Sequence, residues 1–288
     1  MSDLYMITDT SPEKQYIPKN KPGIHDCQFI FKSGQRKLLI SEINFLTRYS
    51  HLSNTVVYAG AAPGMHLNIL IMMFPSITNW ILYDPKAIKV SNLYNDIEVV
   101  VINNYFTEEE AEKYAGDNVL FISDIRSYDS NTGKVPVKKA NETIKKDMDL
   151  QRKLVQAGKF SMSYLKFRLP WETGITSYFN GKLYLTPWLG EYSPELRLAT
   201  DGKEFTDYNN TKIDNKMYYY NTVVRRHKHS FIEKLNFKHI YQDQALELSI
   251  IKDYYHNIKD IDYDEVDEEA SRFIHKYCDT IKKSPHLE

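Results

Sequence analysis

Residues 56–66 (VVYAGAAPGMH) decide the fold. They join a short apolar, β-branched segment to a loop of glycine and small residues, and an apolar helical pattern follows as far as residue 74. A buried strand that runs through such a loop into a helix brings backbone N–H groups to the carboxyl end of a parallel sheet, where open α/β sheets bind ligands. The stretch therefore predicts an α/β fold with a nucleotide-type site at this loop.

The spacing within the loop narrows the class of ligand. Only two glycines occur, Gly60 and Gly64, and no GK[ST] follows, so the loop matches neither the dinucleotide fingerprint nor a triphosphate loop. A nucleoside without phosphates remains, of which S-adenosylmethionine is one example, and such a site needs an acid after the next strand for the ribose hydroxyls. Asp84 lies 20 residues beyond Gly64, directly after residues 79–83 (NWILY). On these two features alone, the alternative is a plain strand-loop-helix turn in which Asp84 caps the helix.

Apolar, strand-like segments alternate with amphipathic helical stretches from about residue 35 onward, as in an α/β domain with a mainly parallel sheet. Strands are predicted at residues 55–60, 79–83, 98–102, 118–123, 160–168, 181–185 and 195–199. Helices are predicted at residues 35–49, 65–74, 109–114, 138–157, 217–235 and 265–283. Three prolines mark the first 30 residues as irregular. We therefore expect an N-terminal arm over residues 1–33 and a single domain over residues 34–288, which ends in a helical, acidic tail.

The composition is that of a globular chain. Of 288 residues, 42% are hydrophobic and 26% charged, which excludes collagen-like and largely disordered proteins. Cys27 and Cys278 stand at opposite ends of the sequence, so a disulfide scaffold and a zinc module are excluded and a reducing compartment is favoured. The N-terminus carries acids where a signal peptide has basic and apolar residues, and the longest apolar run is too short to span a bilayer. We expect a cytoplasmic protein with no membrane partner and no metal.

Charge is distributed unevenly, although the net charge is −1. Residues 131–170 hold ten Lys or Arg against three acids, and residues 212–240 hold seven against two. Residues 243–270 hold two basic side chains against ten acids. A chain of this kind can present a basic face to nucleic-acid phosphates while its net charge stays near zero. The alternative for each basic run is a set of helical charges that only solvate a surface.

Five segments, in this order, carry a resemblance to a known family. They are residues 34–39 (GQRKLL), 58–66 (YAGAAPGMH), 121–127 (FISDIRS), 165–170 (LKFRLP) and 192–198 (YSPELRL). From about residue 16 to residue 235 the chain resembles the poxvirus cap-specific mRNA (nucleoside-2′-O-)methyltransferases, which also serve as the processivity subunit of the viral poly(A) polymerase. The resemblance implies a Rossmann-like class I S-adenosylmethionine-dependent methyltransferase fold, with a mainly parallel central sheet flanked by helices. It also implies methyl transfer to the ribose 2′-oxygen of the first transcribed nucleotide of capped mRNA.

The resemblance places the family's catalytic quartet on Lys37, Asp124, Lys166 and Glu195. A ribose hydroxyl is a weak nucleophile at neutral pH, so a base must take its proton as the new bond forms. A lysine serves as that base only when burial or a nearby cation lowers its pKa. We expect Lys166 to be the base, with Lys37 and the two carboxylates positioning and tuning it. Taken singly, each of the four is more simply explained as a surface or strand-end charge.

For S-adenosylmethionine, the resemblance implies contacts from the first helix, the glycine loop and the ends of the following strands. The expected residues are Gln35, Tyr58, Gly60, Ala62, Gly64, His66, Asp84, Lys86, Asp124 and Arg126. Lys86 stands where the family has arginine, and lysine cannot make the bidentate contact of a guanidinium.

A 7-methylguanine cap is cationic and electron-poor, so aromatic walls bind it by stacking and cation–π attraction, while carboxylates accept its N1 and N2 protons. The resemblance implies cap contacts from Tyr16, Trp171, Glu172, Tyr192 and Asp214, and RNA contacts from Arg168 and Arg197. The alternative for Trp171 is an ordinary core aromatic.

Three functions stay open at this point. The leading one is 2′-O-methylation of capped mRNA, with a poly(A) polymerase catalytic subunit as a further partner. The second is a non-catalytic, RNA-binding subunit of a polyadenylating complex, against which the intact quartet argues. The third is a ribosomal-RNA 2′-O-methyltransferase, which would not need Trp171, Glu172 and Asp214.

Overall fold

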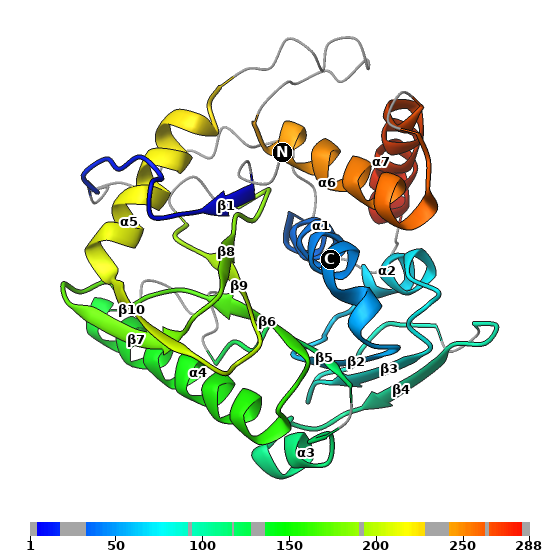
Figure 1. Cartoon of the computed structure of the whole chain (residues 1–288), viewed down its shortest axis with the longest axis horizontal. Helices are drawn as coiled ribbons and strands as arrows, with labels where there is room; N and C mark the ends of the chain where they lie inside the picture. The colour runs from blue at the N-terminus through cyan, green and yellow to red at the C-terminus, as the bar shows by residue number, and fades with distance from the viewer. Residues whose placement is uncertain are drawn as a thin grey trace.

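The computed structural model describes residues 5–17, 33–91, 94–116, 118–127, 136–189, 193–227, 242–262 and 265–283. Its main sheet consists of β1 (Met6–Ile7), β2 (Thr55–Ala59), β3 (Asn79–Tyr83), β4 (Glu98–Ile102), β5 (Leu120–Ser123), β6 (Met162–Phe167), β8 (Lys182–Tyr184) and β9 (Leu196–Thr200). The eight strands lie in the order β1-β8-β9-β6-β5-β2-β3-β4 (Figure 1). All pairings from β4 to β6 are parallel, and β9, β8 and β1 extend the sheet by antiparallel pairings.

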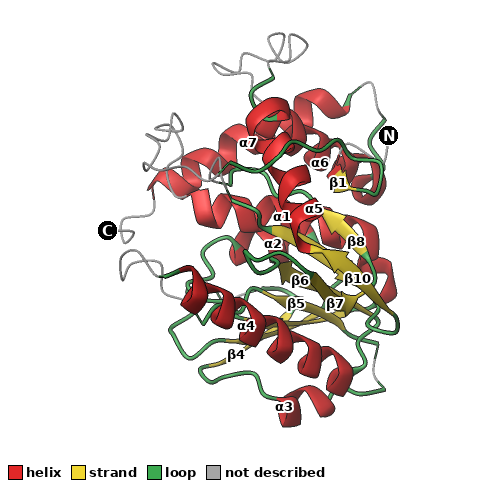
Figure 2. Ribbon diagram, turned by 90° about the vertical axis from the view of Figure 1, so that its left-hand side faces the viewer, coloured by secondary structure: helices red, strands yellow, loops and turns green. Residues whose placement is uncertain are grey.

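Helices cover both faces of this sheet. They are α1 (Ser33–Tyr49), α2 (Leu67–Met73), α3 (Glu108–Glu112), α4 (Val137–Gly158), α5 (Asn210–Tyr219), α6 (Gln242–Lys259) and α7 (Val266–Lys283). Figures 1 and 2 show α1 and α2 on one face, with α6 and α7 outside α1, and α3 and α4 on the other face. A second sheet pairs β7 (Ile175–Phe179) with β10 (Phe205–Asn209). The predicted α/β fold, with a mainly parallel central sheet flanked by helices, is confirmed.

Burial explains why the strand segments could be recognised. In the central strand β2, Val56, Val57 and Tyr58 are all fully buried, because helices cover both of its faces. Parallel strands covered on both faces read as continuous apolar runs rather than as alternating ones. The edge strand β4 is covered less, and Val100 and Val101 are partly exposed there.

The strand order reverses direction between β2 and β5. The chain passes from β2 to β3 and β4 on one side, whereas β5 and β6 lie on the other side of β2. Backbone hydrogen bonds hold the two loops at this point: Gly60 N–H donates to the Tyr83 carbonyl at 2.9 Å, and Asp124 N–H donates to the Ala59 carbonyl at 3.0 Å. Open α/β sheets bind ligands in the crevice at such a reversal.

Some predicted elements differ from the structure. The helix predicted at residues 217–235 is wrong in its start, because α5 begins at Asn210, where the Asn209 side chain accepts from Lys212 N–H and caps it. A π-helical turn, Tyr220–Val224, follows α5, and residues 228–241 lie outside the described residues. The sequence prediction also missed β7, β10 and α6, and it took β1 as irregular. None of the described helices is long and apolar enough to cross a bilayer.

Candidate active site

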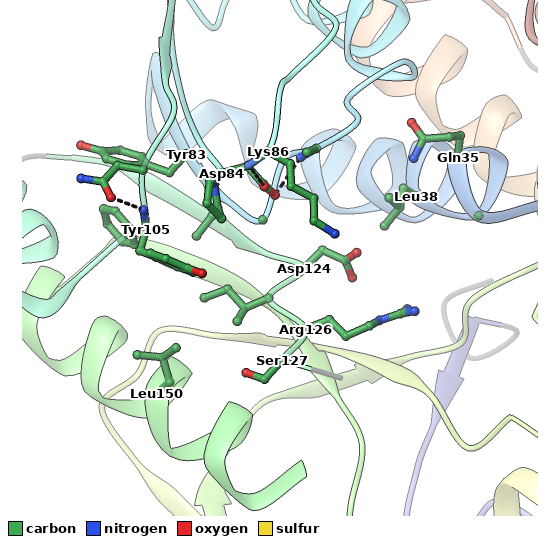
Figure 3. Close-up of a pocket in the computed structure, with 18 of the residues that line it drawn as sticks. Gln35, Leu38, Tyr83, Asp84, Lys86, Tyr105, Asp124, Arg126, Ser127 and Leu150 are labelled. Carbon is green, nitrogen blue, oxygen red and sulfur yellow. Dashed lines mark hydrogen bonds between the residues drawn. The ribbon is translucent and has the colours of Figure 1, made fainter. Parts of the chain in front are cut away.

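A cavity of about 690 Å³ lies at the carboxyl ends of β2, β3 and β5, where the strand order reverses (Figure 3). Seven of the predicted cofactor residues line it: Gln35, Gly60, Ala62, Asp84, Lys86, Asp124 and Arg126. The structure therefore has a cavity at the predicted nucleotide-type site, and seven of the ten predicted cofactor residues line it.

Gly60 brings two strand ends together in the cavity wall. Its φ of +85° lies in the left-handed region, and a Cβ at this position would stand 2.8 Å from the backbone carbon of Asp124. Gly64, with φ +70°, is crowded instead by Ile88, whose Cγ2 would be 2.7 Å from an added Cβ. Both positions require glycine. Gly60 lines the cavity, whereas Gly64 lies in the same loop but does not line it.

Asp84 serves both as a turn cap and as a wall of the cavity. Its Oδ2 accepts the Ala62 backbone N–H at 3.0 Å, and its Oδ1 accepts that of Lys86 at 2.8 Å. Each carboxylate oxygen has a second lone pair for a further donor. No described helix begins at Asp84, so the helix-cap alternative is wrong; the turn contacts are compatible with the predicted ribose contact, which stays a prediction.

Tyr58 and His66 lie behind the cavity wall and not in it, which corrects the expectation that they contact the cofactor directly. Both are buried, and both bind Glu42 of α1: the Tyr58 hydroxyl donates to Oε1 at 2.6 Å, and His66 Nε2 lies 2.9 Å from Oε2. His66 Nδ1 lies 3.0 Å from Oε1 of Gln35, which also accepts Met65 N–H. These side chains thus hold Gln35 at the cavity. Burial, reinforced by Glu42, raises the pKa of Tyr58 well above its usual value.

An aromatic wall of the cavity escaped the sequence prediction. Asn104, Tyr105 and Phe106 line the cavity after β4, and Leu150 of α4 lies across from them (Figure 3). Tyr105 is 70% exposed, although it is a large aromatic side chain. The pair of aromatic residues three and four positions after the carboxyl end of β4 was an available signal, since that edge of the sheet carries the site. Such a wall offers stacking area to a planar ring.

The four predicted catalytic residues form one buried cluster. Lys37 Nζ lies 2.7 Å from Oε1 of Glu195. Lys166 Nζ lies 3.1 Å from Oδ1 of Asp124 and 3.5 Å from Oε2 of Glu195. The residues come from α1, from the end of β5, from β6 and from the start of β9. Asp124 and Lys37 also line the cavity, so the cluster and the cavity share a wall.

The charges of the cluster hold one another in place. Burial lowers the pKa of Lys37, Glu195 opposes this shift, and Lys166 adds to it. Burial alone would raise the pKa of Asp124 and Glu195, but the surrounding cations outweigh it and hold both carboxyl groups well below their usual range. Both carboxylates are therefore ionised at any pH at which the protein works.

Arg197 belongs to this cluster, which corrects its prediction as an RNA-binding residue. It is 1% exposed, and its guanidinium donates to Asp124 Oδ1 at 2.7 Å, to Glu195 Oε1 at 3.2 Å and to the Ser123 carbonyl at 3.3 Å. Burial alone would lower its pKa, but the two carboxylates outweigh burial and raise it. A side chain this deep in the sheet cannot reach an RNA strand; it fixes the two carboxylates instead.

Three of the predicted cap residues meet in a second, small pocket. Tyr16, Trp171 and Asp214 line it together with Pro194 and Tyr218. The Tyr16 ring meets that of Tyr218 edge to face at 5.4 Å. Within the described part of the chain, Oδ1 of Asp214 is buried and has no hydrogen-bond partner. Burial raises the pKa of Asp214 to about 6, against the opposing charge of Arg168. A buried acceptor of this kind is suited to a ligand N–H.

Trp171 is 37% exposed, so it is not the core aromatic of the alternative explanation. Its backbone N–H donates to Asn141 of α4 at 2.8 Å. The Arg168 guanidinium lies 3.9 Å from the centre of the Trp171 ring. The ring therefore already presents one π face to a cation. Whether Arg168 also contacts RNA stays a prediction.

The structure does not bring Glu172 to this pocket. Its carboxylate turns to α4, where Oε1 lies 2.5 Å from Lys145 Nζ and Oε2 accepts from Asn141 at 3.4 Å. Trp171, the residue before it, lines the pocket instead. Tyr192, the remaining predicted cap residue, lies outside the described residues.

Comparison with known proteins places the chain among viral proteins. It is 28% identical over 214 residues to the cap-specific mRNA (nucleoside-2′-O-)-methyltransferase of Myxoma virus (strain Lausanne), over 67% of this chain and 61% of that protein. It is 30% identical over 220 residues to the protein of the same name from Fowlpox virus (strain NVSL), over 67% of this chain and 68% of that protein. The chain thus spans 61% of the length of the Myxoma relative.

Among solved structures, the bluetongue virus capping protein VP4 matches with a TM-score of 0.45 and 15% identity, over 72% of this chain and 34% of that chain. A family model, by contrast, matches almost the whole chain, from residue 2 to residue 280, and it describes the poly(A) polymerase regulatory subunit. The chain belongs to the poly(A) polymerase regulatory subunit family.

Proposed function

We propose that this protein transfers a methyl group from S-adenosylmethionine to the ribose 2′-oxygen of the first transcribed nucleotide of capped mRNA. The observation that carries the proposal is the buried cluster of Lys37, Asp124, Lys166 and Glu195, which shares a wall with the cavity at the sheet reversal. The Myxoma and Fowlpox relatives bear the name of this activity.

The cavity residues fit S-adenosylmethionine in chemistry. Asp84 would accept ribose hydroxyls, the Gly60 loop would allow close approach of the backbone, and Tyr105 with Phe106 would stack on the adenine. When bound, this cosubstrate supplies an electrophilic methyl group on a sulfonium centre. The requirement for glycine at position 60 is consistent with such a site, because a Cβ would collide with the backbone of Asp124 in the cavity wall.

The cluster is arranged to accept one proton. With all five groups charged, its three cations and two carboxylates carry one net positive charge, and the cluster becomes neutral when one lysine is deprotonated. The neutral Lys166 amine would take the proton of the 2′-hydroxyl while the oxygen forms its bond to the methyl carbon and the bond from that carbon to the sulfonium sulfur breaks, which releases S-adenosylhomocysteine. Arg197 keeps its charge throughout, and it holds Asp124 and Glu195 in place while Lys166 changes its charge.

The cap pocket lies close to this cluster along the chain. Pro194 in the pocket is adjacent to Glu195, and Trp171 follows Lys166 by five residues. A methylated guanine between Trp171 and Tyr16, with its N–H groups toward Asp214, would place the next nucleotide at the reactive lysine. This pocket favours a capped substrate over ribosomal RNA.

A second role in polyadenylation is favoured by the family description, which names a regulatory subunit of poly(A) polymerase. We propose a poly(A) polymerase catalytic subunit as the protein partner and a cytoplasmic location for the complex. The intact cluster argues that the chain is also an enzyme and does not act only as a binding subunit.

The test is transfer of tritium from labelled S-adenosylmethionine to three RNAs that differ only at the 5′ end. We expect label in RNA with a 7-methylguanosine cap, less with an unmethylated cap and none with a triphosphate end. Nuclease digestion should recover the label in the first transcribed nucleotide as a 2′-O-methyl ribose. Equal labelling of all three RNAs would contradict the cap-specific proposal, and no labelling of any would leave the regulatory subunit as the favoured function.

A further inference from the structure

Glu247 of α6 is a buried carboxylate that connects α1 to the segment before the catalytic cluster. Its side chain is 1% exposed. Arg36 of α1 donates to it from Nε at 3.0 Å and from its terminal nitrogen at 2.5 Å, the Trp188 indole N–H donates at 3.2 Å, and the Tyr277 hydroxyl of α7 donates at 3.1 Å. The two oxygens thus bind donors from α1, from α7 and from the segment between β8 and β9.

The same network holds Trp188 in an unfavourable backbone conformation. The Arg36 guanidinium lies 4.1 Å from the centre of the indole ring, and Trp188 has φ +61°. A bulky residue keeps a left-handed conformation only where its surroundings impose it. One turn before Glu247, the carboxylate of Asp243 accepts the backbone N–H of Trp188 and pairs with Arg225, which also donates to the Leu189 carbonyl. Two buried acids of α6 therefore fix residues 188–189.

Two of the three partners of Glu247, Arg36 and Trp188, are close in sequence to active-site residues. Arg36 stands between Gln35, which lines the cavity, and Lys37, which binds Glu195 at 2.7 Å. Trp188 precedes Glu195 by seven residues. A displacement of either segment would separate Lys37 from Glu195, and small losses of alignment at a reacting centre cost large factors in rate.

We propose that Glu247 is a positioning residue of the active site. It holds the first turn of α1 and the segment before Glu195 in the arrangement in which Lys37 reaches Glu195. The expected effect on kcat rests on the proposed methyl transfer. The contacts of Glu247 are independent of that proposal. It gives the buried acids of the C-terminal helices a part in the active site.

Asp253 provides a matched control for Glu247. It lies on the same helix and pairs with Arg48 of α1 at 3.2 Å, near the other end of that helix and away from Lys37. Glu247→Gln keeps the shape of the side chain but removes the charge opposite Arg36, and Asp253→Asn does the same opposite Arg48. We expect kcat on capped RNA to fall at least about tenfold in Glu247→Gln and less than about twofold in Asp253→Asn. Binding of a 7-methylguanosine nucleotide should change less than about twofold in either variant.

Amide hydrogen exchange gives a readout that does not depend on activity. Glu247→Gln should speed exchange in the first turn of α1 and in residues 185–189, whereas Asp253→Asn should affect only the last turns of α1. If the wild-type protein transfers no methyl group, the proposed function fails, and exchange still decides whether Glu247 holds these segments. Should Glu247→Gln not fold, Trp188→Phe removes the indole N–H donor and part of the ring area that lies against Arg36, and it should produce the same pattern more weakly. Equal loss of kcat in the two acid variants, or unchanged exchange at the start of α1, would overturn the proposal.

Discussion

The cavity and the proposed cap pocket are built in different ways. The cavity is formed by the ends of neighbouring strands of one parallel sheet, whose loops are held by backbone hydrogen bonds. The pocket is assembled from Tyr16 of the N-terminal arm, Trp171 after β6, and Asp214 of α5. A site made by backbone is fixed with the fold, whereas a site made by side chains from separate segments can change without loss of the fold. Substitutions should therefore act through the backbone in the cavity and through ligand preference in the pocket.

The largest effect is expected at Lys166, in the charged cluster with Asp124 and Glu195. Lys166→Ala should lower methyl transfer at least about a hundredfold, the usual contribution of a positioned general base. Binding of S-adenosylhomocysteine and of a 7-methylguanosine nucleotide should stay near wild type, because Asp124 and Glu195 keep Arg197 and Lys37 as partners. Single-turnover kinetics and calorimetry measure the two quantities separately.

Lys203→Ala is the matched control, since the Lys203 side chain is 79% exposed. It should leave both transfer and binding unchanged. Near wild-type turnover in Lys166→Ala would remove Lys166 from the role of base and direct attention to Lys37, whose pKa burial lowers.

The next largest effect is expected at Gly60, in the cavity only. Gly60→Val should abolish detectable calorimetric binding of S-adenosylhomocysteine, because its Cβ would meet the Asp124 backbone at 2.8 Å and its φ of +85° is strained for any other residue. The variant should still bind a 7-methylguanosine nucleotide, since the pocket shares no backbone with this loop. Loss of both kinds of binding would show that the two regions are not independent, and loss of neither would refute the placement of the cofactor.

The difference between a backbone-built cavity and a side-chain-built pocket also explains which features can be predicted from the sequence. The strands Asn79–Tyr83 and Glu98–Ile102 match their predicted bounds, because both form short apolar runs between polar turns, although the edge strand β4 is only partly buried. The glycine loop and Asp84 could be interpreted from local spacing for the same reason. The quartet could not, because Lys37 and Lys166 meet only through the packing of α1 against the sheet, and the resemblance to a family supplied it.

Other features depend on tertiary contacts that no local pattern reports. Arg197 is expected at a surface, since buried arginines are rare without paired carboxylates. Its partner Asp124 lies 73 residues away in the sequence. Tyr58 and His66 stand beside the glycine loop in the sequence, which suggests ligand contacts. In the structure both bind Glu42, which lies on α1 and is distant from them in the sequence. Helix α6 is buried on several sides, so the helical periodicity of its apolar residues is weak.

In the cap pocket, Trp171 should control ligand preference without controlling the fold. The wild-type protein should bind a 7-methylguanosine nucleotide about five- to thirtyfold better than the guanosine one, because stacking on a desolvated cation adds about 1 to 2 kcal/mol. Trp171→Ala should erase most of that preference and leave S-adenosylhomocysteine binding unchanged. The ring is 37% exposed, so its removal should cost little thermal stability.

Trp171→Phe sharpens this test, because a smaller ring keeps the stacking geometry and should keep part of the preference. A folded Trp171→Ala variant with undiminished preference would move the cap site elsewhere. An unfolded one would show that Trp171 acts as a core residue in spite of its exposure.

The smallest effect is expected at Asp214, and it links the pocket to pH. Burial raises the pKa of its carboxyl group to about 6. Since the folded protein holds this proton more tightly than the unfolded chain does, the group favours folding less as pH rises from about 4 to about 6. Ligand binding should show the opposite slope, because only the ionised carboxylate accepts both N–H groups of the base.

Affinity for the 7-methylguanosine nucleotide should therefore rise about three- to tenfold between pH 5 and pH 7, with a midpoint near 6. Asp214→Asn keeps an acceptor but has no charge to titrate, so its affinity should be lower at pH 7 and independent of pH over this range. Asp207→Asn, at an exposed position of β10, should keep the wild-type slope. A slope that survives in Asp214→Asn would assign the titration to another group, and a flat wild-type profile would show that this carboxylate does not bind the base.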